Sequence, residues 1–131
     1  MPKKKLSRSK IVKKLDAIFS RYIRKKNSKN NLAKCFTCGK VDEWKYLQCG
    51  HFQSRRHYAT RWSEVNCQVQ CSGCNIFKHG EQYKFSLELN KKYGSTTAND
   101  LHIQSHKEVK YSTDDLLEMI KKYQELFDNL K

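Results

Sequence analysis

The chain has 131 residues, of which 27 are Lys or Arg and 13 are Asp or Glu, so its formal charge is +14. This length predicts one domain with appendages. The positive charge favours a polyanion such as DNA as the partner. No apolar run reaches transmembrane length, and the first residues do not resemble a secretory signal. We therefore expect no membrane partner and a cytoplasmic location.

The excess positive charge lies at the front of the chain. Residues 1–34 contain thirteen Lys or Arg and a single acid, Asp16. Apolar residues recur there at helical spacing and predict an amphipathic helix over 9–26, preceded by a disordered basic arm over 1–8. Because this excess is positive and local, contact with phosphate is favoured over the alternative that these side chains only face solvent. We therefore expect DNA contacts from the lysines of the arm, which are Lys3, Lys4 and Lys5.

The middle of the chain predicts short strands and turns over 33–74. Within it, "EWKYLQCGHF" alternates large apolar and polar residues, which is typical of a strand. A helix is expected to begin at the second cysteine pair and to continue to Tyr93. Gly80 is expected to bend or interrupt that helix, and Gly94 to end it.

The end of the chain predicts one more helix. Ser112 and Asp115 fit a capping box, and the apolar stripe that follows them is expected to pack in the core, against the N-terminal helix. The fold class is therefore α+β, with a small zinc-stapled core flanked by N-terminal and C-terminal helices. We divide the chain into a basic arm and helix (1–30), the core (31–95) and a helical extension (96–131).

Two cysteine pairs have the spacing of metal ligands: Cys35 with Cys38, and Cys71 with Cys74, separated by 32 residues. Four thiolates suit tetrahedral Zn²⁺, and four-cysteine sites are closed and structural. Without a secretory signal, a metal is favoured over disulfides. The two remaining cysteines, Cys49 and Cys67, are interpreted as small buried residues.

Four residues between and beyond these pairs follow a recognisable order, which is His51, Asn66, Asn75 and His79. This order resembles the HNH (ββα-metal) nuclease motif, in which a hairpin carries a histidine and an asparagine and a helix carries a metal ligand. Many members of that family have zinc knuckles flanking the motif. The resemblance implies a ββα-metal core and a metal-dependent nuclease.

A second resemblance covers roughly residues 18–94. The segments "IFSRYIRKK", "CFTCGK", "CGHFQSRRHYATRW", "NCQVQCSGCN" and "YKFSLELNKKYG" are similar to the phage recombination protein NinG (Rap) family. This resemblance implies a DNA endonuclease of phage or prophage recombination that acts inside the bacterial host, with branched DNA as a candidate substrate.

The resemblances imply a role for each residue of the motif. His51 is the general base, Asn66 orients His51 or braces the hairpin, and Asn75 and His79 bind a catalytic Mg²⁺ or Mn²⁺. The chemistry suits these residue types, because a histidine accepts a proton from water near neutral pH and a divalent ion offsets the charge that develops on phosphate. Plainer roles stay open: a packed histidine, a turn-capping or helix-capping asparagine, and a surface histidine.

One position departs from the HNH pattern. Many HNH proteins place an acid or a second histidine immediately before the base as a metal ligand, but this chain has Gly50 there. Gln48, His57, His79 or Glu81 are candidates to complete the metal shell. Otherwise the ion is held by few protein ligands together with waters and phosphates, as Mg²⁺ tolerates, or the protein is a weakened nuclease.

The segment after the proposed base is rich in arginine. Because the guanidinium fork suits phosphate oxygens, we expect DNA contacts from three residues, Arg55, Arg56 and Arg61. The aromatic residues of this segment are expected to pack the hairpin rather than to stack on bases. The leading hypothesis is a metal-dependent DNA endonuclease, and the alternative is a zinc-stapled DNA-binding module without cleavage activity. The sequence leaves the oligomeric state open.

Overall fold

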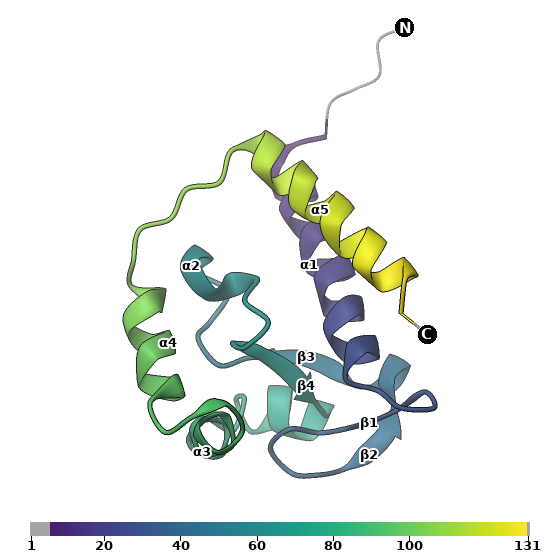
Figure 1. The fold of residues 1–131 in the computed structure, drawn as a ribbon, viewed down its shortest axis with the longest axis vertical. Helices are drawn as coiled ribbons and strands as arrows, with labels where there is room; N and C mark the ends of the chain where they lie inside the picture. The colour runs from purple at the N-terminus through teal and green to yellow at the C-terminus, as the bar shows by residue number, and fades with distance from the viewer. Residues whose placement is uncertain (1–5, 131) are drawn as a thin grey trace, which may run out of the picture.

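The computed structural model describes residues 6–130, and the predicted contacts of Lys3, Lys4 and Lys5 lie outside that range. The fold is α+β, as predicted, with two small antiparallel sheets and helices around them (Figure 1). Within the described residues, every helix is too short or too polar to span a bilayer. The α-helices are α1 (Arg8–Lys26), α2 (Tyr58–Arg61), α3 (Gln82–Tyr93), α4 (Thr97–Ser105) and α5 (Thr113–Asp128).

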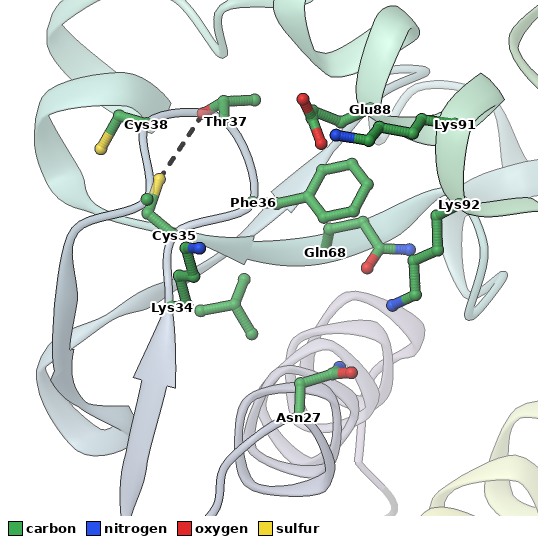
Figure 2. Close-up of a pocket in the computed structure, with 12 residues that line it drawn as sticks. Asn27, Lys34, Cys35, Phe36, Thr37, Cys38, Gln68, Glu88, Lys91 and Lys92 are labelled. Atoms are coloured by element: carbon green, nitrogen blue, oxygen red, sulfur yellow. Dashed lines mark hydrogen bonds between the residues drawn. The ribbon is translucent and has the colours of Figure 1, made fainter.

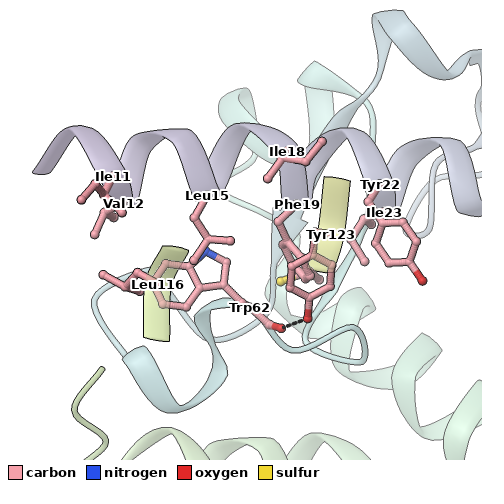
Figure 3. Packing of buried hydrophobic residues seen from close by; sticks show 11 residues of the cluster. Ile11, Val12, Leu15, Ile18, Phe19, Tyr22, Ile23, Trp62, Leu116 and Tyr123 are labelled. Atoms are coloured by element: carbon pink, nitrogen blue, oxygen red, sulfur yellow. Dashed lines mark hydrogen bonds between the residues drawn. The ribbon is translucent and has the colours of Figure 1, made fainter. Parts of the chain in front are cut away.

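The main core lies where α1 and α5 run side by side (Figure 1). The α1 helix begins one residue before the predicted start, and the Ser7 hydroxyl caps it by accepting from the Lys10 N–H at 3.3 Å. The predicted capping box of Ser112 and Asp115 opens α5. Apolar residues of both helices meet Trp62 and Cys67 in one cluster, in which Phe19 packs edge-to-face on Tyr123 at 4.9 Å (Figure 3). The predicted packing of the two terminal helices is confirmed.

Two hairpins occupy the middle of the chain. β1 (Leu32–Lys34) pairs with β2 (Val41–Glu43), and β3 (Gln48–His51) pairs with β4 (Cys67–Gln70). The expected strand over "EWKYLQCGHF" is therefore only partly correct, because residues 44–46 form a 3-10 turn, η1 (Trp44–Tyr46). The reason is a long-range contact: the Arg24 guanidinium of α1 donates to the carbonyls of residues 44, 45 and 47 at 3.2–3.4 Å. A regular strand would alternate these carbonyls in direction.

The helix expected from the second cysteine pair to Tyr93 is divided in two. One π-helical turn, η2 (Gly73–Phe77), is followed by a turn with positive φ at His79, Gly80 and Glu81, and α3 begins only at Gln82. Gly80 therefore interrupts the helix, and Gly94 ends α3, both as predicted. The α4 helix was not predicted, because Leu101 is its only buried large apolar residue and its amphipathic signal is weak. It covers Phe85 and Leu89 of α3.

The contact between α1 and α5 gives a direct stability test. Leu116 is fully buried in the main core, whereas its neighbour Leu117 is 45% exposed. We expect Leu116→Ala to lower the free energy of unfolding by about 2–5 kcal/mol, through lost burial and a cavity. Leu117→Ala is the matched control and should change it by about 0.5 kcal/mol or less. Urea unfolding followed by circular dichroism measures both, and equal losses would contradict this packing.

Candidate functional site

The four paired cysteines come together as predicted. The Sγ atoms of Cys35, Cys38, Cys71 and Cys74 all lie within 4.8 Å of one another, and those of Cys38 and Cys71 are 3.7 Å apart. A tetrahedral Zn²⁺ with bonds of about 2.3 Å separates its sulfur ligands by roughly 3.8 Å. The group can therefore hold a metal such as zinc. It joins the first hairpin to the segment that follows β4.

The first knuckle is built by backbone hydrogen bonds. The Cys35 N–H donates to the Lys40 carbonyl at 2.8 Å, and Gly39 takes a φ of +81°, which glycine adopts without strain. Burial opposes ionisation of Cys35, but hydrogen bonds from the Cys71 backbone and the Thr37 side chain outweigh it and lower its pKa to about 6. The thiolate form that metals bind is thus favoured at Cys35. A hydrogen bond from the Lys40 backbone opposes the shift at Cys38, but burial and neighbouring thiols raise its pKa, and burial raises that of Cys74 to about 12, so a bound ion would have to displace their protons. Figure 2 shows this knuckle beside a pocket of about 510 Å³ that contains none of the predicted catalytic residues.

A larger pocket, of about 950 Å³, contains the predicted catalytic residues His51, Asn75 and His79. His51 ends β3, Asn75 lies in η2, and His79 lies in the turn before α3. The helix expected from the second cysteine pair to Tyr93 would carry both Asn75 and His79. It ends between them instead, and the turn that follows still brings both to the same pocket.

His51 is half-buried and fixed by one backbone contact. Its Nε2 lies 2.9 Å from the Arg61 carbonyl oxygen. Because a carbonyl only accepts, Nε2 carries the proton of the neutral ring and Nδ1 has the free lone pair. Burial lowers the pKa of His51, and the contact with Arg61 opposes that shift only in part. The neutral ring, which can accept a proton, is therefore favoured.

Asn66 is fully buried and braces the loop between β3 and β4. Its Oδ1 accepts from the Gln53 N–H at 2.7 Å, and its Nδ2 donates to the carbonyls of Gln53 at 3.0 Å and Thr60 at 3.1 Å. These bonds fix the backbone immediately before Arg61, whose carbonyl holds His51. Asn66 does not line the pocket. Its hydrogen bonds hold the loop, and its part in catalysis stays a prediction.

Asp16 was missed by the sequence reasoning. This α1 residue lines the pocket, and its carboxylate accepts from the Arg61 guanidinium at 3.1 and 2.6 Å and from the Trp62 indole at 3.0 Å. Its position as the one acid among thirteen basic residues was the available signal. Asp16 therefore ties α1 to the segment that holds His51.

The three predicted phosphate-binding arginines have different surroundings. Arg55 and Arg56 are exposed on the loop after β3, and Arg55 lines the pocket. The Arg61 guanidinium is engaged inside the protein by Asp16 and by the Arg55 carbonyl. DNA contact by all three stays a prediction, and Arg61 has a structural task in addition.

The space beside Gly50 is occupied by Gln70. A Cβ atom at Gly50 would lie 2.6 Å from the Gln70 Cδ. Gln70 is fully buried, and its Nε2 donates to the Gly80 carbonyl at 2.9 Å and to the Thr37 hydroxyl at 3.1 Å. A larger residue at Gly50, such as the acid or histidine that many HNH proteins carry before the base, would require the buried Gln70 carboxamide to move.

Of the other candidate metal ligands, Gln48 lines the pocket, whereas Glu81 and His57 do not. Gln48 lines the pocket with Asn75, and its Oε1 accepts from the Asn75 Nδ2 at 2.7 Å. The Asn75 Oδ1 takes no part in that hydrogen bond and is therefore available as a metal ligand. Glu81 lies before α3 and pairs with Lys84 at 3.7 Å. His57 lies at the start of α2, with its ring 5.5 Å from that of His106.

The aromatic residues of the loop pack as expected. Trp62 is buried and stacks on Tyr58 at 5.7 Å, and Phe52 packs on Phe85 at 5.5 Å. These rings therefore anchor the loop to the main core and to α3.

The brace predicts a large effect of Asn66→Ala. The substitution leaves the Gln53 N–H and two carbonyls buried without this partner, so we expect the free energy of unfolding to fall by at least about 2 kcal/mol. Asn99→Ala, at an exposed position in α4, is the matched control and should have an effect of about 0.5 kcal/mol or less. Denaturant unfolding measures both. A loss for Asn66→Ala no larger than that of the control would refute the brace.

The contact between Gly50 and Gln70 predicts coupling between the two positions. Gly50→Ala should cost about 1–3 kcal/mol of stability because the buried carboxamide has to move. In a Gln70→Ala background the same change should cost less by at least about 1 kcal/mol. Gly73→Ala is the control, since its nearest neighbour would be 3.7 Å away. Equal costs of Gly50→Ala in both backgrounds, measured by urea unfolding, would show that Gln70 does not restrict this position.

Comparison with known proteins gives one match. A family model described as bacteriophage lambda NinG protein matches residues 2–131, which is nearly the whole chain. The chain matches no curated protein and no solved structure. The coverage by the family model is sufficient to assign the family, in agreement with the resemblance seen in the sequence. The chain belongs to the phage lambda NinG family.

Proposed function

We propose that this chain is a metal-dependent HNH-type endonuclease that hydrolyses phosphodiester bonds of DNA during phage or prophage recombination. One observation carries the proposal: the neutral imidazole of His51 stands in a 950 Å³ pocket with its Nε2 bound to the Arg61 carbonyl. That contact leaves Nδ1 as the proton acceptor. Membership of the phage NinG family supports a task on recombining DNA.

The proposed reaction begins with proton transfer from a water molecule to His51. The water oxygen then forms a bond to phosphorus as one ester bond to phosphorus breaks, and the released alkoxide takes a proton from solvent. The lowered pKa of His51 keeps its ring unprotonated and ready at neutral pH. Asn66 acts on His51 through the backbone that it holds. Asp16 acts through the side chains of Arg61 and Trp62, and its negative charge also opposes the lowering of the His51 pKa.

A divalent ion, Mg²⁺ or Mn²⁺, would supply positive charge against the developing charge on the phosphate. The candidate ligands are the Asn75 Oδ1 and the His79 ring, with Gln48 oriented beside them. None of these ligands carries a negative charge. They fit such an ion when phosphate oxygens of the DNA and waters complete its shell, as Mg²⁺ commonly requires.

The DNA would lie over the exposed basic residues around the pocket. Arg55 and Arg56 follow His51 by four and five residues, and Arg55 lines the pocket. Beyond the pocket lining, α1 exposes further basic residues, which are Lys13, Lys14 and Arg21. Arginine forks bind phosphate oxygens in two-point contacts. Zinc in the four-cysteine group would be structural, because all four of its positions are taken by protein.

A second candidate function is DNA binding without cleavage. The observation that favours it concerns the described residues that line the pocket, among which Asp16 is the only carboxylate. Its two oxygens are engaged by Arg61 and Trp62. A DNA-binding module would keep the basic surface and the cysteines but would have no use for a neutral His51.

The test is a cleavage assay on linear, supercoiled and four-way-junction DNA with Mg²⁺, Mn²⁺ or EDTA. We expect cleavage with a divalent ion, none with EDTA, and a loss of at least about 100-fold in His51→Ala, which removes the general base. His57→Ala is the matched control, because His57 lies outside the pocket, and it should cut like the parent.

Two results would contradict the proposed function. If His51→Ala cuts as fast as the parent, His51 is not the base. If the parent binds DNA but cuts none of the three substrates with either metal, the DNA-binding module is the correct reading. Circular dichroism of each variant shows whether the fold is retained.

A further inference from the structure

The two cysteines outside the knuckles meet His51 on one face of the second hairpin. The strand register pairs His51 with Cys67, and Cys49 is two residues before His51 in β3. Side chains two residues apart on a strand, and side chains directly opposite each other, share a face of the sheet. The Sγ atoms of Cys49 and Cys67 and a ring nitrogen of His51 all lie within 4.8 Å of one another.

This group lies at the edge of the pocket rather than wholly inside the core. Cys67 is fully buried at the base of the group, whereas Cys49 and His51 are half-buried and line the 950 Å³ pocket. Cys67 Sγ and His51 Nε2 both contact the Arg61 carbonyl, at 3.4 and 2.9 Å. The three donor atoms therefore lie close together between the buried Cys67 and the pocket that Cys49 and His51 line, and a metal that took Nε2 would replace its hydrogen bond to the Arg61 carbonyl.

The donor set suits a soft or borderline metal. Two thiolates and one imidazole are three ligands of a tetrahedral site, and with Zn²⁺ the two thiolates give a neutral centre, which costs less to bury than a charged one. Ligand atoms of tetrahedral Zn²⁺ are roughly 3.5–3.8 Å apart, so distances that now reach up to 4.8 Å would have to shorten by at most about 1.3 Å. The fourth position faces the pocket, as in zinc sites that keep one place for water or a ligand.

We propose that Cys49, His51 and Cys67 form a second metal site, separate from the four-cysteine group, that binds Zn²⁺ or a similar thiophilic ion with its fourth position open to the pocket. Binding releases one proton from each thiol, and the ion takes both sulfurs as thiolates. A metal on this site holds a ring nitrogen of His51. Metal occupancy and proton acceptance by His51 would then compete, although the site itself does not depend on nuclease activity.

The test is a count of bound zinc on the full chain by native mass spectrometry, in a non-thiol reductant with Zn²⁺ in excess. We expect two zinc ions on the parent and one on Cys49→Ala/Cys67→Ala. Co²⁺ in place of Zn²⁺ adds an optical readout, because thiolate-to-cobalt absorption should be weaker in the double variant. Each single change, Cys49→Ala and His51→Ala, should weaken the second zinc by at least about tenfold.

Controls separate loss of the site from loss of the fold. Cys49→Ala alters a half-buried position and spares the buried Cys67, so it tests the site even if the double variant unfolds. His57→Ala should keep both zinc ions, since His57 does not belong to the group. Retention of the first zinc and of the circular dichroism spectrum shows that each variant is folded.

Three results would overturn the proposal. The first is a single zinc on the parent at saturation. The second is a second zinc that persists in Cys49→Ala/Cys67→Ala, which would place it elsewhere. The third is a Cys49–Cys67 disulfide in protein handled in air, together with no second zinc under reduction, which would make the pair a redox couple instead.

Discussion

The structure around His51 depends on one buried side chain, the carboxamide of Asn66. It accepts one hydrogen bond and donates two, all to the backbone of the loop between β3 and β4. A buried amide of this kind is stabilising only while all its bonds are made, so it allows the loop one conformation. That conformation presents the Arg61 carbonyl to His51. The orientation of the proposed base is thus set by a residue that does not enter the pocket.

The same segment is held from outside by α1. Asp16 binds the guanidinium of Arg61 and the indole of Trp62, and Trp62 belongs to the core between α1 and α5. The packing of the two terminal helices and the position of the pocket therefore depend on the same residues. The four-cysteine group restricts the segment around Asn75, because it joins the first hairpin to the turn that carries this residue.

The parts of this fold that the sequence predicts are those with local signals. Helical spacing of apolar residues predicts α1, the capping box predicts the start of α5, and paired cysteines predict the metal-binding group. The parts that it misses depend on partners distant in the chain. The turn at residues 44–46 follows from Arg24, and the helix break before α3 brings His79 to the pocket by an unexpected route. Asp16 stands out as the one acid of a basic segment, but its partners Arg61 and Trp62 are about 45 residues away. The absence of a metal ligand at Gly50 is visible in the sequence, but the sequence does not show that the Gln70 side chain of the neighbouring strand occupies the space beside it.

The central claim is that the fold holds His51 with its proton on Nε2 and with Nδ1 free to accept another. Nitrogen-15 NMR of the histidine rings tests this directly on chelator-treated protein that retains a single zinc. The account predicts that His51 is the Nε2–H tautomer at neutral pH and that Asn66→Ala, if folded, allows a mixture of tautomers. A His51 ring protonated on Nδ1, or charged at neutral pH, would contradict it.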